Sequence, residues 1–593
     1  MLALLLLSQL AMAQSPLVAF SRPGGFYEDS FALELSCGEA CHICFTVNGD
    51  TPTDSSMRYQ SPLYLDTTLY SPSNIYTIRD CLSSVFYLPD DVERAIVIRA
   101  AAFDDDGNRV SPVATQSYFI RALGCDLHGL PVLSIVTDSL SLFDYETGIL
   151  VPGASFNPED SVFSGNYYNR GRDWERLINM EFYELDNQGI NQQCGLRVHG
   201  GASRGFQQKG LRLYAREEYG KKRFSHRFFE MTPIYKFKRL NLHPFRCSNW
   251  LQTGGQDFLS QSIAANLNFE SLAVRQTVVF INGEYWGIYT LEESADERYL
   301  EDHYDVSLNE VVLMKYWGVP EYGDLTEWRA LFSWMREADL TQPEDSTFAY
   351  THIDVSCFID YLLFETFSAN LDWPCNNVRI WQPVAGEPFR MFFYDGDGCF
   401  SWYWYNAMEN ATQQDLCSLI INHFLENPYF KEDVYRRYLE LKSTHLSYES
   451  MKAVLDHYRD IVDGEVDGQA ARFQFPTNRD RWLTDMDSAD RFLQRRHWYY
   501  ETEWEWNVLP QHQQEVLSAC YPNPSAGKFR MGAMAATSGD YAVEVVDMMG
   551  RRVYAKTVAL QDGENQIDMD VSLPAGLYVV KVGAATQRII IDR

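Results

Sequence analysis

Residues 358–381 read FIDYLLFETFSANLDWPCNNVRIW, and residues 392–398 read FFYDGDG. In both stretches an apolar run, helix-like in the first and strand-like in the second, leads directly into polar residues that include Asp372, Asn377 and Asp395. Polar side chains at the ends of buried elements are costly unless they meet a partner. We therefore expect these groups to converge on hydrogen-bond partners or on a cation.

The spacing of these residues matches the needs of phosphoryl transfer. That chemistry uses a carboxylate to orient the acceptor hydroxyl, and an Asn and an Asp to hold metal ions. A protein-kinase catalytic loop places its Asn five residues after its Asp, which is the separation of Asp372 and Asn377. Residues 378–395 predict a strand hairpin that delivers Asp395 at a strand end, closely followed by Asp397. We predict Asp372 as the catalytic residue and the other three as metal ligands, although N-L-D replaces the kinase H-R-D signature.

A basic, glycine-rich segment lies upstream. Residues 195–216 read GLRVHGGASRGFQQKGLRLYAR and contain a predicted strand after the glycines. Gly200 and Gly201 would let the backbone approach phosphate groups, and Arg204 and Lys209 would supply positive charge. We predict that these four residues bind the phosphates of a nucleotide.

A phosphate-positioning lysine requires an acidic partner in the kinase arrangement. Residues 282–300 read NGEYWGIYTLEESADERYL, so that Glu293 enters a predicted helix. We predict an ion pair between Lys209 and Glu293, with Glu292 as the neighbouring alternative.

Together with LPVLSIVTD at residues 130–138, these segments resemble the spore-coat CotH kinase family over residues 125–505. The resemblance implies an atypical, α+β protein-kinase-like domain that binds ATP with Mg²⁺ or Mn²⁺. It also implies phosphorylation of Ser or Thr in proteins outside the cytoplasm. By this resemblance the catalytic residue is Asp372, the metal ligands are Asn377 and Asp395, and the phosphate-positioning pair is Lys209 with Glu293.

Residues 15–121 alternate short apolar strands with turns, which predicts an antiparallel β-sandwich. Three of its segments are FSRPGGFYEDSFALELS (20–36), CFTVNGDTPTDSSMRYQSPLYL (44–65) and IVIRAAAFDDDGNRVSPVATQSYFI (96–120). They resemble the chitobiase/hexosaminidase C-terminal module. The resemblance implies an accessory module without catalytic residues.

Residues 515–593 return to a strand pattern and predict a small β-sandwich. The segments YPNPSAG (521–527), VVDMMGRRV (545–553) and LPAGLYVVKV (573–582) resemble the C-terminal sorting domain of type IX secretion cargo in Bacteroidetes-type bacteria. The resemblance implies the type IX secretion machinery as a partner and a secreted or cell-surface location.

Export also follows from residues 1–13, which predict a signal peptide because an apolar run ends in A-M-A. No later run reaches the roughly 18 apolar residues of a membrane span. The net charge of −31 argues against nucleic acid or an anionic membrane as the main partner. In an oxidising compartment, the first four cysteines predict two disulfides in any of three pairings. These cysteines are Cys37, Cys41, Cys44 and Cys81.

Two other functions are open on the sequence alone. A surface adhesin would use the kinase-like domain as an inactive scaffold and the N-terminal sandwich to bind polysaccharide or protein. A glycoside hydrolase is disfavoured, because the hexosaminidase-like module is an appendage and no paired-carboxylate centre stands out elsewhere. Asp372, Asn377 and Asp395 together favour catalysis, since a scaffold has no need of all three.

Overall fold

The computed structural model describes residues 18–38, 41–71, 92–125, 129–246 and 251–504 of the first part of the chain. In the last part it describes residues 517, 520, 522–535, 538–547, 551–561, 563–582 and 585–592. The chain forms two units, Met1–Trp504 and Glu505–Arg593. The predicted signal peptide lies outside the described residues.

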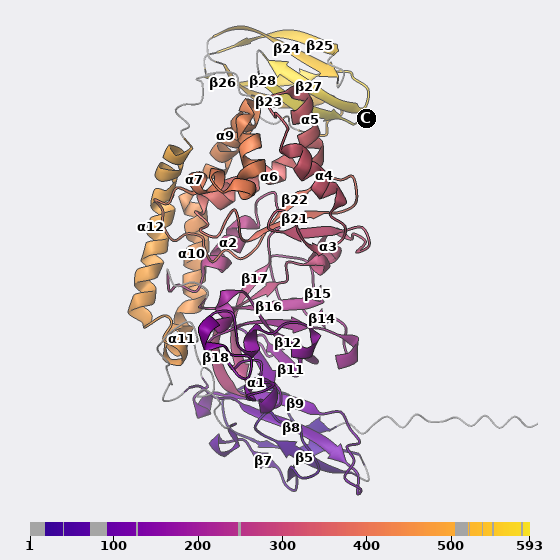
Figure 1. Cartoon of the computed structure of the whole chain (residues 1–593), viewed down its shortest axis with the longest axis vertical. Helices are drawn as coiled ribbons and strands as arrows, with labels where there is room; N and C mark the ends of the chain where they lie inside the picture. The colour runs from indigo at the N-terminus through magenta and orange to yellow at the C-terminus, as the bar shows by residue number, and fades with distance from the viewer. Residues whose placement is uncertain are drawn as a thin grey trace, which may run out of the picture. The chain divides into compact units, whose positions relative to one another are not determined.

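The first strands build a β module around a five-stranded sheet in the order β2-β9-β8-β5-β6 (Figure 1). Two short pairs, β1-β4 and β3-β7, complete it. Strand β8 is buried along its whole length, and its alternate residues, among them Ile96 and Ile98, enter the module core. The strands are β1 (Ala19–Phe20), β2 (Gly25–Tyr27), β3 (Ala32–Leu33), β4 (Leu35–Ser36), β5 (His42–Thr46), β6 (Met57–Arg58), β7 (Leu63–Tyr64), β8 (Ile96–Phe103) and β9 (Ala114–Ile120).

The cysteines of this module do not pair as predicted. Cys37 and Cys41 form a disulfide. Cys44 keeps a free thiol, which is buried and donates to the Asp54 backbone carbonyl at 3.6 Å. The prediction of two disulfides among the four cysteines is therefore wrong, because strand β5 directs Cys44 into the interior. Cys81 lies outside the described residues.

Seven strands close into a barrel in the order β10-β11-β12-β13-β16-β18-β17. β10 pairs with β17 in parallel, and the other neighbouring strands are antiparallel. Alternate apolar residues such as Leu211, Leu240 and Leu291 fill its core. The strands are β10 (Val132–Val136), β11 (Arg176–Tyr183), β12 (Gly189–His199), β13 (Gly210–Tyr214), β16 (Arg239–Pro244), β17 (Val274–Ile281) and β18 (Glu284–Glu293).

The residues between these core positions form a polar row on the opposite face of the strands. The strand register places Arg212 opposite Asn241, and Asn241 opposite Glu292. His243 lies one step along the same face, opposite Thr290. Helix α2 (Gln256–Ala264) follows β16 in the chain and packs against β17. The barrel thus presents a set of polar side chains beside α2.

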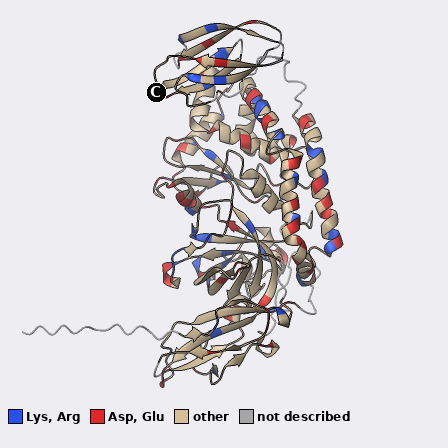
Figure 2. Cartoon of the chain, turned by 180° about the vertical axis from the view of Figure 1, so that it is seen from behind, with Lys and Arg blue, Asp and Glu red and all other residues tan. Residues whose placement is uncertain are grey.

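After the barrel the chain is richer in helices, as the α+β prediction requires. A four-stranded sheet has the order β20-β19-β21-β22, and α10 and α12 run side by side in Figure 1. These two helices carry acidic and basic residues in alternation (Figure 2), which is typical of solvent-facing helices. Among the described residues, no helix is both long and apolar enough to cross a membrane. The strands are β19 (Val312–Lys315), β20 (Val319–Tyr322), β21 (Val378–Gln382) and β22 (Arg390–Phe393); the helices are α3 (Glu297–Tyr304), α4 (Thr326–Met335), α5 (Pro343–His352), α6 (Val355–Phe367), α7 (Ala407–Thr412), α8 (Leu419–Glu426), α9 (Pro428–Lys442), α10 (Tyr448–Val462), α11 (Val466–Phe473) and α12 (Arg479–Glu503).

The second unit is a small β fold with its own core, to which Val543, Val580 and Ile589 belong. Its four-stranded sheet has the order β25-β24-β27-β28, and β23 pairs with β26. The strands are β23 (Lys528–Ala535), β24 (Gly539–Asp547), β25 (Arg552–Leu560), β26 (Gly563–Asp570), β27 (Gly576–Val582) and β28 (Ala585–Ile591).

A buried carboxylate joins the N-terminal module to the barrel. Glu181 on β11 is fully buried and accepts hydrogen bonds from the Ser117 hydroxyl at 2.5 Å and the Ser117 backbone N–H at 3.2 Å. Tyr183 and Asn191 donate to the same carboxyl group at 2.7 and 3.1 Å. Because Ser117 lies on β9 of the module, these bonds tie the two parts together. Burial raises the pKa of Glu181 to about 7.

This raised pKa predicts a pH-dependent stability. Between the ordinary pKa of a Glu, about 4.3, and about 7, the folded chain binds more protons at Glu181 than the unfolded chain does. Its contribution to the free energy of unfolding therefore falls as the pH rises through this window. We expect the melting temperature of Glu181→Gln to depend less steeply on pH between 5 and 8 than that of the wild type. Equal slopes in a calorimetric comparison would contradict the assignment.

Candidate active site

The first part of the site is the loop after helix α6. The helix is buried over most of its length and ends at Phe367, after which Ala369 adopts a left-handed backbone conformation. Asn370 then donates to Glu365 Oε2 at 2.8 Å and accepts from the Asp372 backbone N–H at 3.2 Å. Asn370 stands where the H-R-D signature has its His, and it fixes the backbone that carries Asp372.

The three central predicted residues come together at the end of this loop. The Asn377 side-chain amide lies 3.5 Å from Asp372 Oδ2 and donates to the Asp395 backbone carbonyl at 3.2 Å. Strands β21 and β22 form the predicted hairpin and deliver Asp395 to this position. Asn377 and Asp395 both have a positive φ, 52° and 62°, a strained conformation that Asn and Asp tolerate best and that is enriched at functional sites.

Glycines on either side of Asp397 permit close approach to the neighbouring elements. The Gly396 backbone N–H donates to Asp257 Oδ1 at 2.7 Å, and a Cβ atom at Gly396 would lie 2.4 Å from Ser260. A Cβ atom at Gly398 would lie 2.5 Å from Asn370 Oδ1. Larger residues would therefore push this segment away from α2 and from the loop that holds Asp372.

The polar row of the barrel supplies the other wall of the site. His243 Nε2 lies 3.0 Å from Asp397 Oδ2, and Asn241 donates to Glu292 Oε1 at 3.1 Å. Arg212 donates to Asn241 Oδ1 at 2.7 Å. Of these residues, only Asp397 and, as an alternative, Glu292 are predicted from the sequence. The available signal was the alternation in RLNLHP (239–244), where polar residues fall between core leucines.

The site concentrates carboxylates, of which Asp257 and Glu292 are buried, Asp395 and Asp397 are half-buried and Asp372 is exposed. Desolvation, and next the Asp397 carboxylate, raise the pKa of Asp395 well above its usual value and raise that of Asp372 as well. Burial, and next Asp257, raise the pKa of Glu292. Like charges this close disfavour ionisation unless a cation compensates them. The arrangement is therefore suited to bind divalent cations.

The predicted ion pair between Lys209 and Glu293 is not formed. Lys209 is buried, and its Nζ donates to the backbone carbonyls of Arg204 and Phe206, both at 2.8 Å. Glu293 instead lies 2.7 Å from His303 Nε2 and accepts from the Ala273 backbone N–H at 3.0 Å. The strand register explains the difference. Lys209 lies just before the start of β13, whereas Glu293 is level with Leu213 near the end of that strand.

The glycine-rich segment forms the turn between β12 and β13, and Arg204 braces it from within. Arg204 is buried and donates to the backbone carbonyls of Gly200 at 2.8 Å and Tyr167 at 2.9 Å. Burial lowers the pKa of Arg204 to about 10. Gly200 has a φ of 112°, and the Gly201 carbonyl accepts from Tyr168. The bonds of Arg204 therefore hold the loop in shape, while its predicted contact with phosphate stays untested.

A disulfide that is not predicted from the sequence links the loop of Asp372 and Asn377 to the helical part. Cys375, between Asp372 and Asn377, is bonded to Cys417. The loop that it closes spans 42 residues, which corresponds to about 4 kcal/mol in the chain-entropy description.

This link predicts that Cys417→Ser loosens the loop that carries Asp372 and Asn377. We expect the variant to melt at a lower temperature and to transfer phosphate several-fold more slowly, because Asp372 and Asn377 lose a fixed anchor between them. Phosphate transfer and melting temperature would be measured beside Cys41→Ser, which breaks the disulfide of the N-terminal module. Equal losses of transfer in the two variants would contradict a specific role for the Cys375–Cys417 bond.

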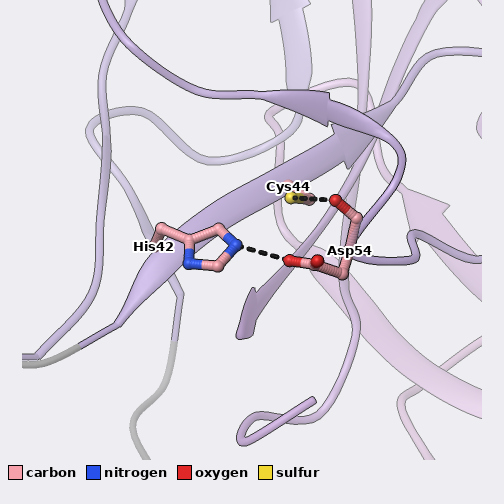
Figure 3. A group of neighbouring side chains, drawn as sticks. All are labelled: His42, Cys44 and Asp54. Atoms are coloured by element: carbon pink, nitrogen blue, oxygen red, sulfur yellow. Dashed lines mark hydrogen bonds and ion pairs between the residues drawn. The ribbon is translucent and has the colours of Figure 1, made fainter. Parts of the chain in front are cut away.

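Another group of potential ligands lies in the N-terminal module (Figure 3). His42 Nε2 lies 2.6 Å from Asp54 Oδ1, and the Cys44 thiol points to the Asp54 backbone carbonyl. Each group is thus used to hold the segment around Asp54 against β5. We read this cluster as a structural brace.

Comparison with known families identifies the central domain. The family described as CotH kinase protein matches residues 196–500. The chain belongs to the CotH kinase family. The Secretion system C-terminal sorting domain matches residues 519–592, and the Chitobiase/beta-hexosaminidase C-terminal domain matches residues 22–115. No curated protein matches the chain.

These matches confirm the three predicted resemblances and the order of a β-sandwich-like module, an α+β CotH domain and a C-terminal β-rich domain. The sorting domain supports export to the cell surface or the medium. The matches lie within the predicted ranges 15–121, 125–505 and 515–593, whose exact limits stay predictions.

Membership of the CotH kinase family suggests the use of ATP with a divalent cation. The side chains present fit such an ion, because Asp372, Asn377 and Asp395 offer the oxygen ligands that Mg²⁺ and Mn²⁺ prefer. The neighbouring carboxylates would ionise more readily with such a cation beside them. Asn377 and Asp395 would hold the cation.

Proposed function

We propose that this CotH protein is an exported protein kinase that transfers the γ-phosphate of ATP to Ser or Thr hydroxyls of extracytoplasmic or surface proteins. The observation that supports it best is the convergence of Asp372, Asn377 and Asp395 on a loop and a hairpin that follow in the kinase order. The sorting domain agrees with substrates outside the cytoplasm.

In this proposal Asp372 orients the acceptor hydroxyl and accepts its proton. Loss of hydration around its carboxyl group, and next the Asp397 carboxylate, raise the pKa of Asp372, which makes its carboxylate a stronger base than that of an ordinary Asp. Asn377 and Asp395 hold Mg²⁺ or Mn²⁺, which would neutralise charge on the phosphates. Asp397 contacts His243 and connects this half of the site to the barrel.

The lysine–glutamate pair of protein kinases has no counterpart at Lys209 and Glu293. In protein kinases the lysine lies on the third strand and the glutamate on the helix that follows. Here strands β12 and β13 form the glycine-rich hairpin. If the short pair β14 (Phe224–Ser225) and β15 (Lys236–Phe237) is left out of the count, β16 is the third strand, and helix α2 follows it. His243 and Asp257 occupy these elements, so we propose that the barrel wall around them faces the phosphates.

Nucleotide binding tests the proposal. ATP with Mg²⁺ or Mn²⁺ is expected to raise the melting temperature of the full chain, and neither ATP with EDTA nor the cation alone should give the same rise. A matched experiment with AMP would show whether the terminal phosphates are needed. If ATP and cation together produce no rise beyond that of the cation alone, the nucleotide site is refuted.

The alternative is an adhesin in which the kinase-like domain is a scaffold. The observation in its favour is that Lys209 bonds to backbone carbonyls and does not pair with Glu293. That proposal predicts no ATP-dependent rise and retained binding of polysaccharide or surface protein by the full chain.

A further inference from the structure

Three side chains from separate elements meet beside the proposed catalytic residues. His243 on β16, Asp257 on α2 and Glu292 on β18 each offer one potential ligand atom, and these atoms lie within 4.8 Å of one another. Asp257 and Glu292 are 3% and 5% exposed. Two buried carboxylates and a half-buried imidazole thus lie together, with His243 and Glu292 from barrel strands and Asp257 from helix α2.

The fold holds each of the three side chains in place. Asn241 donates to Glu292 Oε1 at 3.1 Å, while Glu292 Oε2 lies 4.0 Å from His243 Nδ1. Gly396 and Gln261 donate to Asp257 Oδ1 at 2.7 and 3.2 Å. One oxygen of each carboxylate is therefore fixed by a neighbour.

The second oxygen of Asp257 is an independent indication of a missing ligand. Asp257 Oδ2 is buried and receives no hydrogen bond from the described residues. A buried carboxylate oxygen without a partner carries a large desolvation cost. A cation that contacts this oxygen, Glu292 and His243 would remove that cost.

We propose that His243, Asp257 and Glu292 bind a divalent first-row transition-metal ion, Mn²⁺ or Zn²⁺, as a site separate from the cation of Asn377 and Asp395. An imidazole with two carboxylates suits these ions better than Mg²⁺ or Ca²⁺, which prefer oxygen ligands throughout. The two carboxyl groups and the imidazole bind the ion in their deprotonated forms. Binding therefore releases any protons that these groups carry, and it requires no other reactant.

The contact with Asp397 supports this choice of ligand atoms. A histidine that binds a metal usually donates its other ring N–H to a carboxylate, which fixes the tautomer and the ring orientation. His243 Nε2 lies 3.0 Å from Asp397 Oδ2, which leaves Nδ1 on the side of Glu292. Asp397, predicted from the sequence as a metal ligand, would then orient His243 from outside the coordination sphere.

The position of the site suggests its role. By their order in the chain, β16 and α2 take the places of the strand and the helix that carry the lysine and the glutamate in protein kinases. A divalent ion held there would supply the positive charge that Lys209 does not bring to this wall. This role rests on the proposed kinase function, whereas binding of the metal itself does not.

Mn²⁺ alone, added to the metal-free full chain, tests the site without any enzyme assay. Pulsed electron paramagnetic resonance is expected to show a directly coordinated imidazole ¹⁴N on bound Mn²⁺. The ¹⁴N signal should disappear in His243→Gln and persist in Asp395→Asn, which removes the other cation site. Asp397→Asn is expected to weaken Mn²⁺ binding by about 10- to 100-fold.

His42→Gln is the matched control, because it removes the other described His–Asp contact and should leave the ¹⁴N signal intact. If His243→Gln does not fold, the nearly isosteric Glu292→Gln should bind Mn²⁺ at least tenfold more weakly, with circular dichroism confirming its fold. The proposal is overturned if bound Mn²⁺ shows no ¹⁴N coupling in the wild type, or if the coupling survives His243→Gln. In that case a proton shared between Asp257 and Glu292 explains the cluster.

Discussion

Asp395→Asn is expected to lower phosphate transfer at least about 10³-fold and, in metal-free buffer, to raise the melting temperature of the chain. Loss of the carboxylate removes a metal ligand, and electrostatic stabilisation of the transferred phosphoryl group is the main contribution of the protein. The same change removes an ionisable group whose pKa in the folded chain is raised first by desolvation and next by the Asp397 carboxylate, and it relieves the repulsion among these carboxylates. Asparagine also tolerates the positive φ of 62° at this position. The substitution therefore removes the charge without straining the backbone.

Two measurements follow for this variant: labelled-phosphate transfer with Mg²⁺ or Mn²⁺, and calorimetry in EDTA. Asp105→Asn serves as the control, because Asp105 is exposed in a hairpin turn of the N-terminal module. It should change neither quantity. A variant Asp395→Asn that melts at a lower temperature in EDTA, or that transfers phosphate at the wild-type rate, would be incompatible with the proposed site.

Asp372→Asn is expected to reduce the transfer rate by about 10²- to 10⁴-fold while leaving nucleotide binding nearly unchanged. Asp372 would act on the acceptor hydroxyl and not on the nucleotide, so only the chemical step depends on its basicity. Its neighbour Asn377 lies 3.5 Å away and should keep its own bond to the Asp395 carbonyl.

The distinguishing result for Asp372→Asn is a split between binding and rate. The ATP-dependent rise in melting temperature should match that of the wild type, whereas the turnover number should fall. A loss of nucleotide binding of similar size would show that Asp372 holds the metal or the phosphates, and the base assignment would then be wrong.

The sequence predicts those parts of the site that depend on local spacing. The expected convergence is found for Asp372, Asn377 and Asp395. One loop and one hairpin connect these residues, and so short a chain allows few other conformations. The pairing of Lys209 with Glu293 was wrong, because it depends on the register across three barrel strands. The pattern of a single sequence does not determine the register between neighbouring strands, and so it does not show which residues of two strands lie opposite each other.

Long-range contacts account for the features that the sequence analysis missed. His243, Asp257 and Glu292 come from a strand, a helix and another strand, and only the closed barrel with α2 beside it brings them together. Cys375 lies in a loop and Cys417, 42 residues further along the chain, in a short 3-10 helix (Asp415–Ser418), so no spacing rule connects them. The number of cysteines predicts a disulfide for Cys44, whereas its place on strand β5 directs the thiol inward.

The most direct test of the kinase assignment is transfer of the γ-phosphate from labelled ATP to an acceptor protein such as casein by the full chain. The account predicts cation-dependent incorporation into phosphoserine or phosphothreonine that is retained in Asp105→Asn and lost in Asp372→Asn. Incorporation that is equal in Asp372→Asn and the wild type, or none by a wild-type chain that binds ATP and the cation, would contradict it.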